Sequence, residues 1–94
     1  MKIVVDSDIP FIKGVLEPWF EVTYSKGSQI DNVLAKDATA LLVRTRTRCD
    51  SALLSGSSVK AIFTATIGMD HIDLDYCNRR GIEVFNAAGC NAGG

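Results

Sequence analysis

The 94-residue sequence lacks a long hydrophobic run, an excess of charge of either sign and any low-complexity segment. No apolar stretch approaches the twenty or so residues of a membrane span, and the first residues resemble a strand rather than a signal peptide. Ten basic residues against eleven acidic ones give a net charge of −1, which argues against a general attraction to nucleic acid or to an anionic membrane. The sequence therefore predicts a soluble cytoplasmic protein without nucleic-acid or membrane partners.

Cysteine is scarce and its spacing is uninformative for metals. Cys49, Cys77 and Cys90 are odd in number and widely separated, which argues against a disulfide framework and against a zinc site. Cys90 has no histidine or second cysteine near it in the sequence, so we expect it to pack rather than to react. Reduced thiols are the expected state.

Histidine occurs once, as His71. Asp70 and Asp73 beside it suit the start of a helix, so we expect local hydrogen bonds to hold His71 in a structural role. We therefore favour this structural role over proton transfer in an enzyme.

What the chain does contain is a regular alternation of short apolar strands and helical segments. A continuous β-branched run such as Ile3-Val4-Val5 is typical of a strand that is covered on both faces in a parallel sheet. Asp8 and Pro10 suit the start of a first helix, and Pro18 its end near residue 16 or 17. The expected strands are 1–6, 21–24, 40–43, 59–63 and 82–85, and the expected helices are 9–20, a weak one around 30–34, 51–54 after Asp50 and 74–80 after Asp73. The class is thus α/β, with a doubly wound five-stranded parallel sheet in the strand order 2-1-3-4-5.

Two polar turns follow neighbouring strands of this sheet. The run from Thr64 to Asp73 supplies hydroxyls, a glycine and free backbone N–H groups after the fourth strand, which suits a small anion. Arg44 and Thr45 follow the third strand, and parallel strands bring both turns to one edge. Arg44 can clamp a carboxylate or phosphate, whereas Arg46 and Arg48 are expected to be solvated.

The remaining polar residues of these turns allow alternatives. Thr66 is better placed to touch a ligand than Thr64, which could be tied to the backbone. Asp6 and Asp8 could bind a metal at the same edge, although helix capping explains Asp8 more simply. A signalling receiver domain would need an aspartate and a lysine where Arg44 and Asn86 stand, and a flavodoxin would need a phosphate loop after the first strand. A non-enzymatic module, such as an isolated lobe, remains the third alternative.

Three motifs together carry a resemblance to a known family. Val43-Arg44-Thr45, Thr64-Ala65-Thr66-x-Gly68-x-Asp70-His71-x-Asp73 and Ala88-Gly89-Cys90-Asn91-Ala92 occur in the order and spacing of the D-isomer-specific 2-hydroxyacid dehydrogenases. The resemblance spans the whole chain and is to the erythronate-4-phosphate dehydrogenases of that family. It implies oxidation of 4-phospho-D-erythronate on the route to pyridoxal phosphate, with NAD as cofactor.

The resemblance also implies a domain arrangement. Residues 1–94 would form the N-terminal segment of a flavodoxin-like substrate-binding domain, cut before the crossover to the NAD-binding domain, so that the chain alone binds no NAD and is inactive. Arg44, Thr45, Thr66 and Gly68 would hold the carboxylate or the phosphate of a small phosphorylated hydroxyacid, while catalytic, cofactor-binding and metal-binding residues would be absent. Because such a segment leaves apolar sheet surface uncovered, we expect a homodimer.

Overall fold

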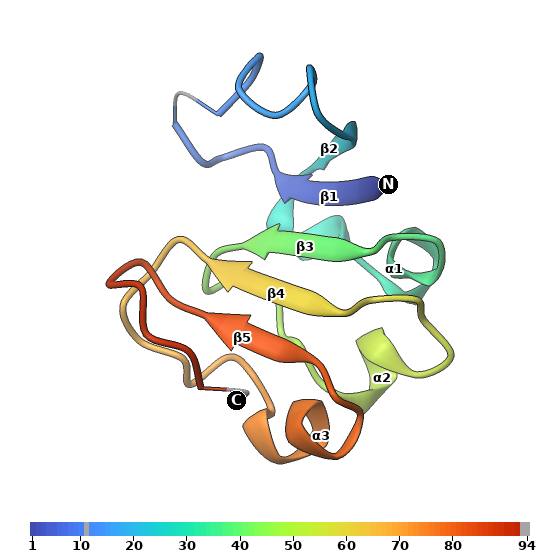
Figure 1. Cartoon of the computed structure of the whole chain (residues 1–94), viewed down its shortest axis with the longest axis vertical. Helices are drawn as coiled ribbons and strands as arrows, with labels where there is room; N and C mark the ends of the chain where they lie inside the picture. Colours follow the sequence, from blue (N-terminus) through green and yellow to red (C-terminus); the bar gives the residue numbers. More distant parts are fainter. Residues whose placement is uncertain (11, 93–94) are drawn as a thin grey trace.

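The computed structural model describes residues 1–10 and 12–92 and contains a five-stranded parallel sheet. Its order is β2-β1-β3-β4-β5, as predicted (Figure 1). All four strand pairings are parallel. The strands are β1 (Lys2–Asp6), β2 (Glu21–Ser25), β3 (Ala40–Val43), β4 (Ala61–Thr64) and β5 (Glu83–Phe85), each within two residues of its expected bounds.

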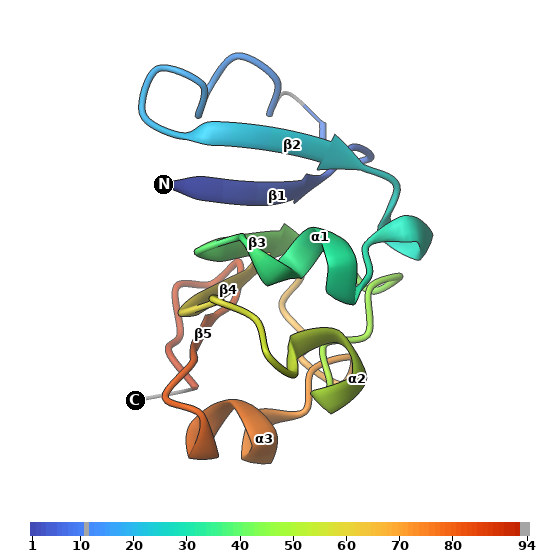
Figure 2. The ribbon, with the colours of Figure 1, turned by 90° about the vertical axis from the view of Figure 1, so that its right-hand side faces the viewer.

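The helices are short. They are a 3-10 turn η1 (Gly27–Gln29) and three α-helices that begin after aspartate caps, α1 (Asn32–Lys36), α2 (Ser51–Leu54) and α3 (Leu74–Arg79). Asp31, Asp50 and Asp73 each accept a hydrogen bond from the backbone N–H three residues further on, which satisfies one of the free donors of the helix start. The predicted caps of α2 and α3 are thereby confirmed. All three α-helices lie on one face of the sheet (Figure 2).

The helix expected over 9–20 is absent from the described part of that segment, which forms successive turns instead. Gly14 has a φ of 87°, a left-handed value that interrupts a right-handed helix, and Pro18 has no N–H to donate. Asp8 consequently caps no helix, and residue 11 of the expected helix lies outside the described residues. A hydrogen bond of 2.9 Å from the Tyr24 hydroxyl to the Glu17 carboxylate links these turns to β2.

The two faces of the sheet differ in how they are covered. On the helical face, Val4, Leu41, Val43, Ile62 and Val84 are all buried, and they form one cluster with apolar residues of the helices. The opposite face is open over β3 to β5, where Phe63 is 40% exposed and stacks on Phe85 with ring centroids 5.1 Å apart. A hollow of about 440 Å³ on that face is lined by apolar residues that include Leu42 and Ala61. The main cluster of buried residues therefore lies on the helical side of the sheet, while Ile3 and Val5 are buried on the opposite face of β1.

The cysteines are not paired. Cys49 and Cys77 are buried, and burial raises the pKa of Cys49 to about 12 and that of Cys77 to about 11. Both therefore stay protonated at neutral pH. Cys90 is exposed, so the expectation that it packs is wrong: it sits in an irregular turn whose backbone, not its thiol, is bonded to Asn86.

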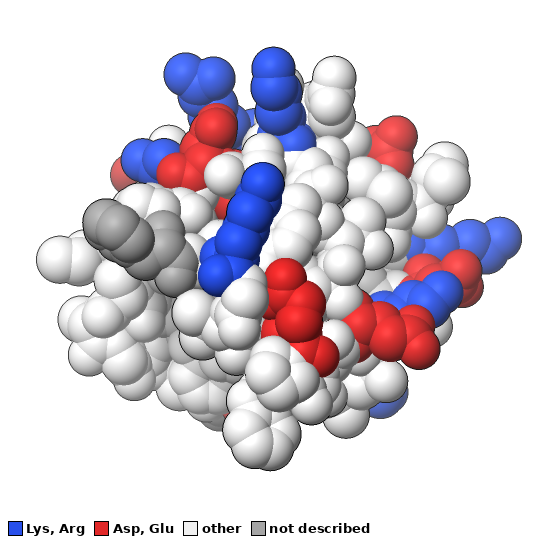
Figure 3. Space-filling view, turned by 90° about the horizontal axis from the view of Figure 1, so that it is seen from above, with Lys and Arg blue, Asp and Glu red and all other residues white. Residues whose placement is uncertain are grey.

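Charges of both signs are interspersed on the end of the molecule beyond β2 (Figure 3). This distribution agrees with the balanced composition of the sequence. Within the described residues, no helix is both long and apolar enough to span a membrane.

We predict that Gly27→Ala destabilises the fold. Gly27 is buried, and an added Cβ would lie 2.7 Å from Asp6 Oδ2 and 3.1 Å from Arg46 Cβ, so one of these groups must move. The expected loss in the free energy of unfolding is about 1–3 kcal/mol, as for other overpacked sites, measured by urea denaturation. Gly68→Ala is the matched control, since nothing lies within 4 Å of its added Cβ. Equal stability of the two variants would contradict this account of the packing.

Candidate functional site at the carboxyl edge of the sheet

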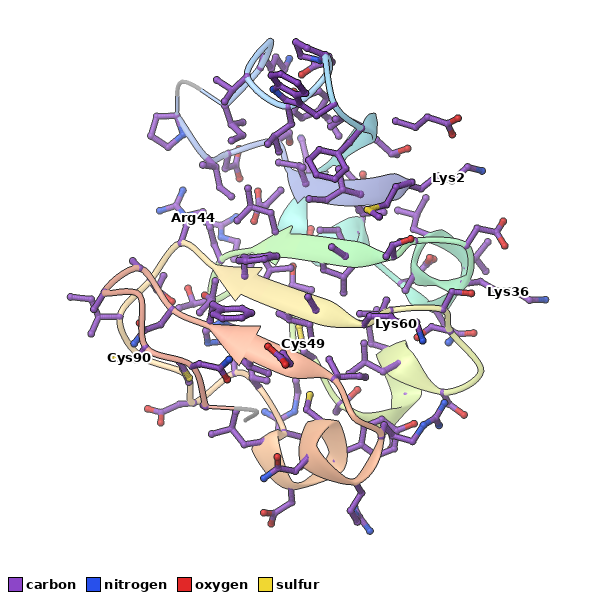
Figure 4. All side chains as sticks on the ribbon, in the orientation of Figure 1. Lys2, Lys36, Arg44, Cys49, Lys60 and Cys90 are labelled. Atoms are coloured by element: carbon purple, nitrogen blue, oxygen red, sulfur yellow. The ribbon has the colours of Figure 1, made fainter. Side chains whose placement is uncertain are left out.

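The register of β3 and β4 brings the two predicted polar turns together. Val43 and Thr64 are paired at the ends of these strands, and the Ala65 N–H donates to the Val43 carbonyl at 2.8 Å. The turns that begin at Arg44 and at Ala65 therefore start side by side. Figure 4 shows Arg44 at the carboxyl end of β3, whereas Lys2, Lys36 and Lys60 lie at the opposite edge.

Three of the four predicted binding residues line one cavity. Thr45, Thr66 and Gly68 surround a space of about 330 Å³ together with Asp70 and His71. Residues from two separate turns thus converge on one volume. The prediction that the turns share an edge is confirmed in geometry, while ligand binding there stays a prediction.

Arg44 lies in an adjoining, smaller cavity of about 130 Å³. This cavity is lined by Asp8, Arg44, Thr45 and Arg46, so Thr45 belongs to both cavities. One guanidinium nitrogen of Arg44 donates to the Asp8 carbonyl at 3.1 Å. The turn after β1 therefore orients Arg44, a contact that the sequence did not indicate.

The interpretation of Thr64 changes with its observed partners. Its hydroxyl lies 2.7 Å from the Thr66 hydroxyl and 3.0 Å from His71 Nε2, rather than being tied to the backbone. The Thr66 hydroxyl in turn donates to the Gly68 carbonyl at 3.0 Å. Four groups thus form a continuous chain of hydrogen bonds along one wall of the cavity.

His71 is held by a hydrogen bond, as expected, but its ring bonds to β4 and not to the neighbouring aspartates. Asp73 caps α3 instead. Burial is the main cause that lowers the pKa of His71 below 6.5, and the nearby Asp70 carboxylate opposes it. The imidazole is therefore neutral at pH 7.

Asn86 fastens the turn after β4. Its side-chain amide donates to the Ile67 carbonyl at 3.0 Å, and the Ala87 N–H donates to the Thr66 carbonyl at 3.0 Å. The side-chain Oδ1 of Asn86 accepts from the N–H groups of Ala88 and Cys90. These contacts give the C-terminal motif a supporting role behind the cavity.

Arg46, Asp70, His71 and Asn86 are the site residues that sequence reasoning missed. Arg46 is exposed, as the sequence predicted, and it also lines the smaller cavity beside Arg44. Thr45 and Arg46 lie in a turn, where the two-residue period of a strand does not apply, so the sequence held no periodic signal for this placement. Arg48 lies 3.6 Å from Asp50 and its side chain is 79% exposed, which agrees with the solvated interpretation.

A metal site at this edge is not supported among residues 1–10 and 12–92, where no three His, Cys, Asp or Glu side chains could hold an ion together. Asp6 is buried and accepts the Asp8 N–H at 2.8 Å through Oδ1. The Asp6 carboxylate therefore stabilises the turn after β1. Asp8 and Asp70 also line the two cavities, so the groups there that suit a small anion are the two arginines of the smaller cavity and the hydroxyls of Thr45 and Thr66.

Comparison with known proteins assigns the family. The family model described as the catalytic domain of the D-isomer specific 2-hydroxyacid dehydrogenases matches residues 3–93. The chain belongs to this family. Among its relatives are erythronate-4-phosphate dehydrogenases from Bacteroides fragilis, 53% identical over 98% of this chain, and from Porphyromonas gingivalis, 41% identical over 98%. The chain spans only 27% and 25% of those two proteins.

Solved structures of the family share the fold. A D-lactate dehydrogenase of Aquifex aeolicus, in complex with NAD and lactic acid, is 29% identical with a TM-score of 0.75 over 92% of this chain and 27% of its own. An NAD-bound 3-phosphoglycerate dehydrogenase of Entamoeba histolytica is 31% identical with a TM-score of 0.73 over 92% of this chain and 32% of its own. Both proteins are dehydrogenases of a small hydroxyacid in structures that contain NAD.

We predict that stability falls on acidification because of His71. Its pKa is lowered in the fold, so its contribution to the free energy of unfolding is complete above about pH 6.5 and is lost as the pH falls through the folded pKa. Urea denaturation at pH 7.5 and 5.5 should show a smaller loss for His71→Gln than for the wild type. A His71 pKa above 6.5, measured by NMR, would contradict the burial of this ring.

Proposed function

We propose that this chain is the substrate-binding segment of an NAD-dependent erythronate-4-phosphate dehydrogenase, which oxidises 4-phospho-D-erythronate on the route to pyridoxal phosphate. The observation that carries the proposal is the convergence of Thr45, Thr66 and Gly68 on one cavity beside Arg44. The erythronate-4-phosphate dehydrogenases among its relatives support this substrate over other hydroxyacids.

The two adjoining cavities suit a substrate with two anionic ends. 4-Phospho-D-erythronate carries a carboxylate at one end and a phosphate at the other, and the cavities meet at Thr45. Arginine binds either group through paired N–H donors, and Arg44 uses only one nitrogen on Asp8. Hydroxyl donors at Thr45 and Thr66 would complete the set.

Hydride transfer requires parts that these residues do not supply. NAD accepts the hydride when it is bound, but the G-x-G-x-x-G turn of a nucleotide-binding fold does not occur in this sequence. We assign no NAD-binding, catalytic or metal-binding residue to this chain. Its role in the reaction is to bind and orient the substrate, and alone it is inactive.

We predict weak, specific anion binding at this edge. Titrating 4-phospho-D-erythronate into the isotope-labelled chain should shift the backbone NMR signals of Thr45, Thr66 and Gly68, with a Kd of about 1 mM for a partly built site. Arg44→Ala should weaken binding about ten-fold because it removes the charged donor at the cavity mouth.

The matched control is Arg48→Ala, which removes an equally charged side chain that lies beside Asp50 instead. It should bind like the wild type. Shifts confined to the pocket near Tyr76, Arg79 and Arg80 would place the ligand elsewhere and refute the proposed site.

We further propose that the chain is a cytoplasmic homodimer in which two copies cover each other's open sheet face. Phe63, Phe85 and Leu42 on this face supply apolar surface that burial would stabilise. The unpaired cysteines support the reducing compartment.

This dimer predicts a mass near twice 10.1 kDa in size-exclusion chromatography with light scattering at ~50 μM protein, a concentration above the Kd of an interface worth 7 kcal/mol or more. Phe63→Lys should shift the mass to the monomer because it places a charge on the open face. Val33→Lys changes an equally apolar, 78% exposed residue on α1 and should leave the dimer intact. A monomeric wild type would reject the dimer.

A further inference from the structure

The hydrogen bonds between His71 and Gly68 have a fixed direction. A carbonyl oxygen can only accept, so the 3.0 Å contact between the Thr66 hydroxyl and the Gly68 carbonyl uses the single proton of Thr66. Thr64 must therefore donate in its 2.7 Å contact with Thr66. Because that uses the only proton of Thr64, the 3.0 Å contact with the ring requires His71 Nε2 to be the donor.

This direction determines the tautomer of His71. The lowered pKa keeps the ring neutral at pH 7, so one nitrogen carries the proton and the chain places it on Nε2. Nδ1 is then the unprotonated nitrogen. With the opposite tautomer, Thr64 would donate to Nε2 and Thr66 would donate to Thr64. The Thr66 proton would then no longer be available to the Gly68 carbonyl or to a ligand.

We propose that His71, acting through Thr64, is a positioning residue that presets the Thr66 hydroxyl as a hydrogen-bond donor to an anionic ligand. One lone pair of Thr66 is occupied by the Thr64 proton, so the proton of Thr66 must point away from Thr64, along the wall of the cavity. The Gly68 carbonyl and an anion compete as acceptors for this proton, and the anion forms the stronger hydrogen bond because it is charged. Only the acceptor of the Thr66 hydrogen bond changes, and no proton is transferred.

The same chain favours a hydrogen-bond acceptor over a donor at Thr66. One of the two lone pairs of the Thr66 oxygen already accepts from Thr64, which leaves one for a ligand that donates, while an oxygen anion finds a proton turned toward it. The Thr66 hydroxyl can serve an anion by rotation about its Cβ–Oγ1 bond, which redirects the proton and leaves the oxygen in contact with Thr64. This inference rests on the proposed function for the location of the binding site, and it adds a reason why that site prefers an anion.

The first test needs no ligand. Long-range proton–nitrogen NMR spectra of the wild-type chain at pH 7.5 distinguish the two nitrogens of His71. The proposal requires the proton on Nε2. A proton on Nδ1 would reverse the chain and overturn the proposal.

The second test measures affinity for inorganic phosphate from the shifts of Thr66 and Gly68. Thr64→Val removes the hydroxyl and keeps the side-chain shape, and it should weaken phosphate binding about five-fold, whereas Thr64→Ser keeps the hydroxyl and should stay within about two-fold of the wild type. His71→Leu should weaken binding like Thr64→Val. Urea denaturation of each variant shows that a folded protein is titrated.

The outcomes separate this inference from the proposed function. If the wild type binds phosphate and Thr64→Val binds it equally well, the chain does not preset Thr66 and only this inference fails. If the wild type binds phosphate but 4-phospho-D-erythronate does not bind at this edge and Arg44→Ala does not weaken binding, the substrate assignment fails. The proposed hydrogen-bond chain from His71 to Thr66 is not affected by that result. If the wild type binds no anion at this edge, both are wrong.

Discussion

The in-register parallel pairing of β3 with β4 is the constraint on which the rest of the structure depends. It matches Leu41 with Ile62 on the helical face and Val43 with Thr64 at the carboxyl edge. A shift of one residue would turn Ile62 away from the core and Thr64 away from His71. The burial that fixes the register therefore also builds the cavity, since one pairing aligns the apolar residues and the two polar turns.

The turns themselves are held by contacts with other segments of the chain. Asn86, after β5, binds the turn after β4, and Cys49 pairs with the backbone around His71, accepting from Asp73 and donating to the His71 carbonyl at 2.9 Å. Thr47 donates to the Gly27 carbonyl at 2.9 Å and joins the turn after β3 to the turn after β2. A rigid edge results from short irregular segments because each is bonded to its neighbour.

Sequence reasoning succeeded where local chemistry decides the structure. Apolar β-branched runs predicted the strands, and Asp50 and Asp73 predicted two helix starts, because both signals act within a few residues. It failed over residues 9–20, where the apolar spacing suggested a helix that Gly14 and Pro18 interrupt. Cys90 was placed wrongly for a related reason, since the exposure of a side chain in an irregular turn has no periodic signal.

The candidate site was predicted in outline and missed in detail. Parallel topology was enough to bring Thr45 and Thr66 together, because strand ends at one edge are neighbours. The bond from His71 to Thr64 joins residues seven apart across a turn whose shape the sequence did not determine. Orientation of Arg44 likewise depends on the backbone after β1, at a sequence separation of 36 residues. Both details belong to tertiary structure.

The central claim is that an anionic hydroxyacid binds between the turns that follow β3 and β4. A crystal structure of this chain grown with 4-phospho-D-erythronate tests it most directly. The account predicts ligand density within hydrogen-bond distance of Thr45 and Thr66, with the Thr66 hydroxyl turned from the Gly68 carbonyl toward a ligand oxygen. Density only in the pocket beside Tyr76 and Arg80, with the two turns unoccupied, would contradict it.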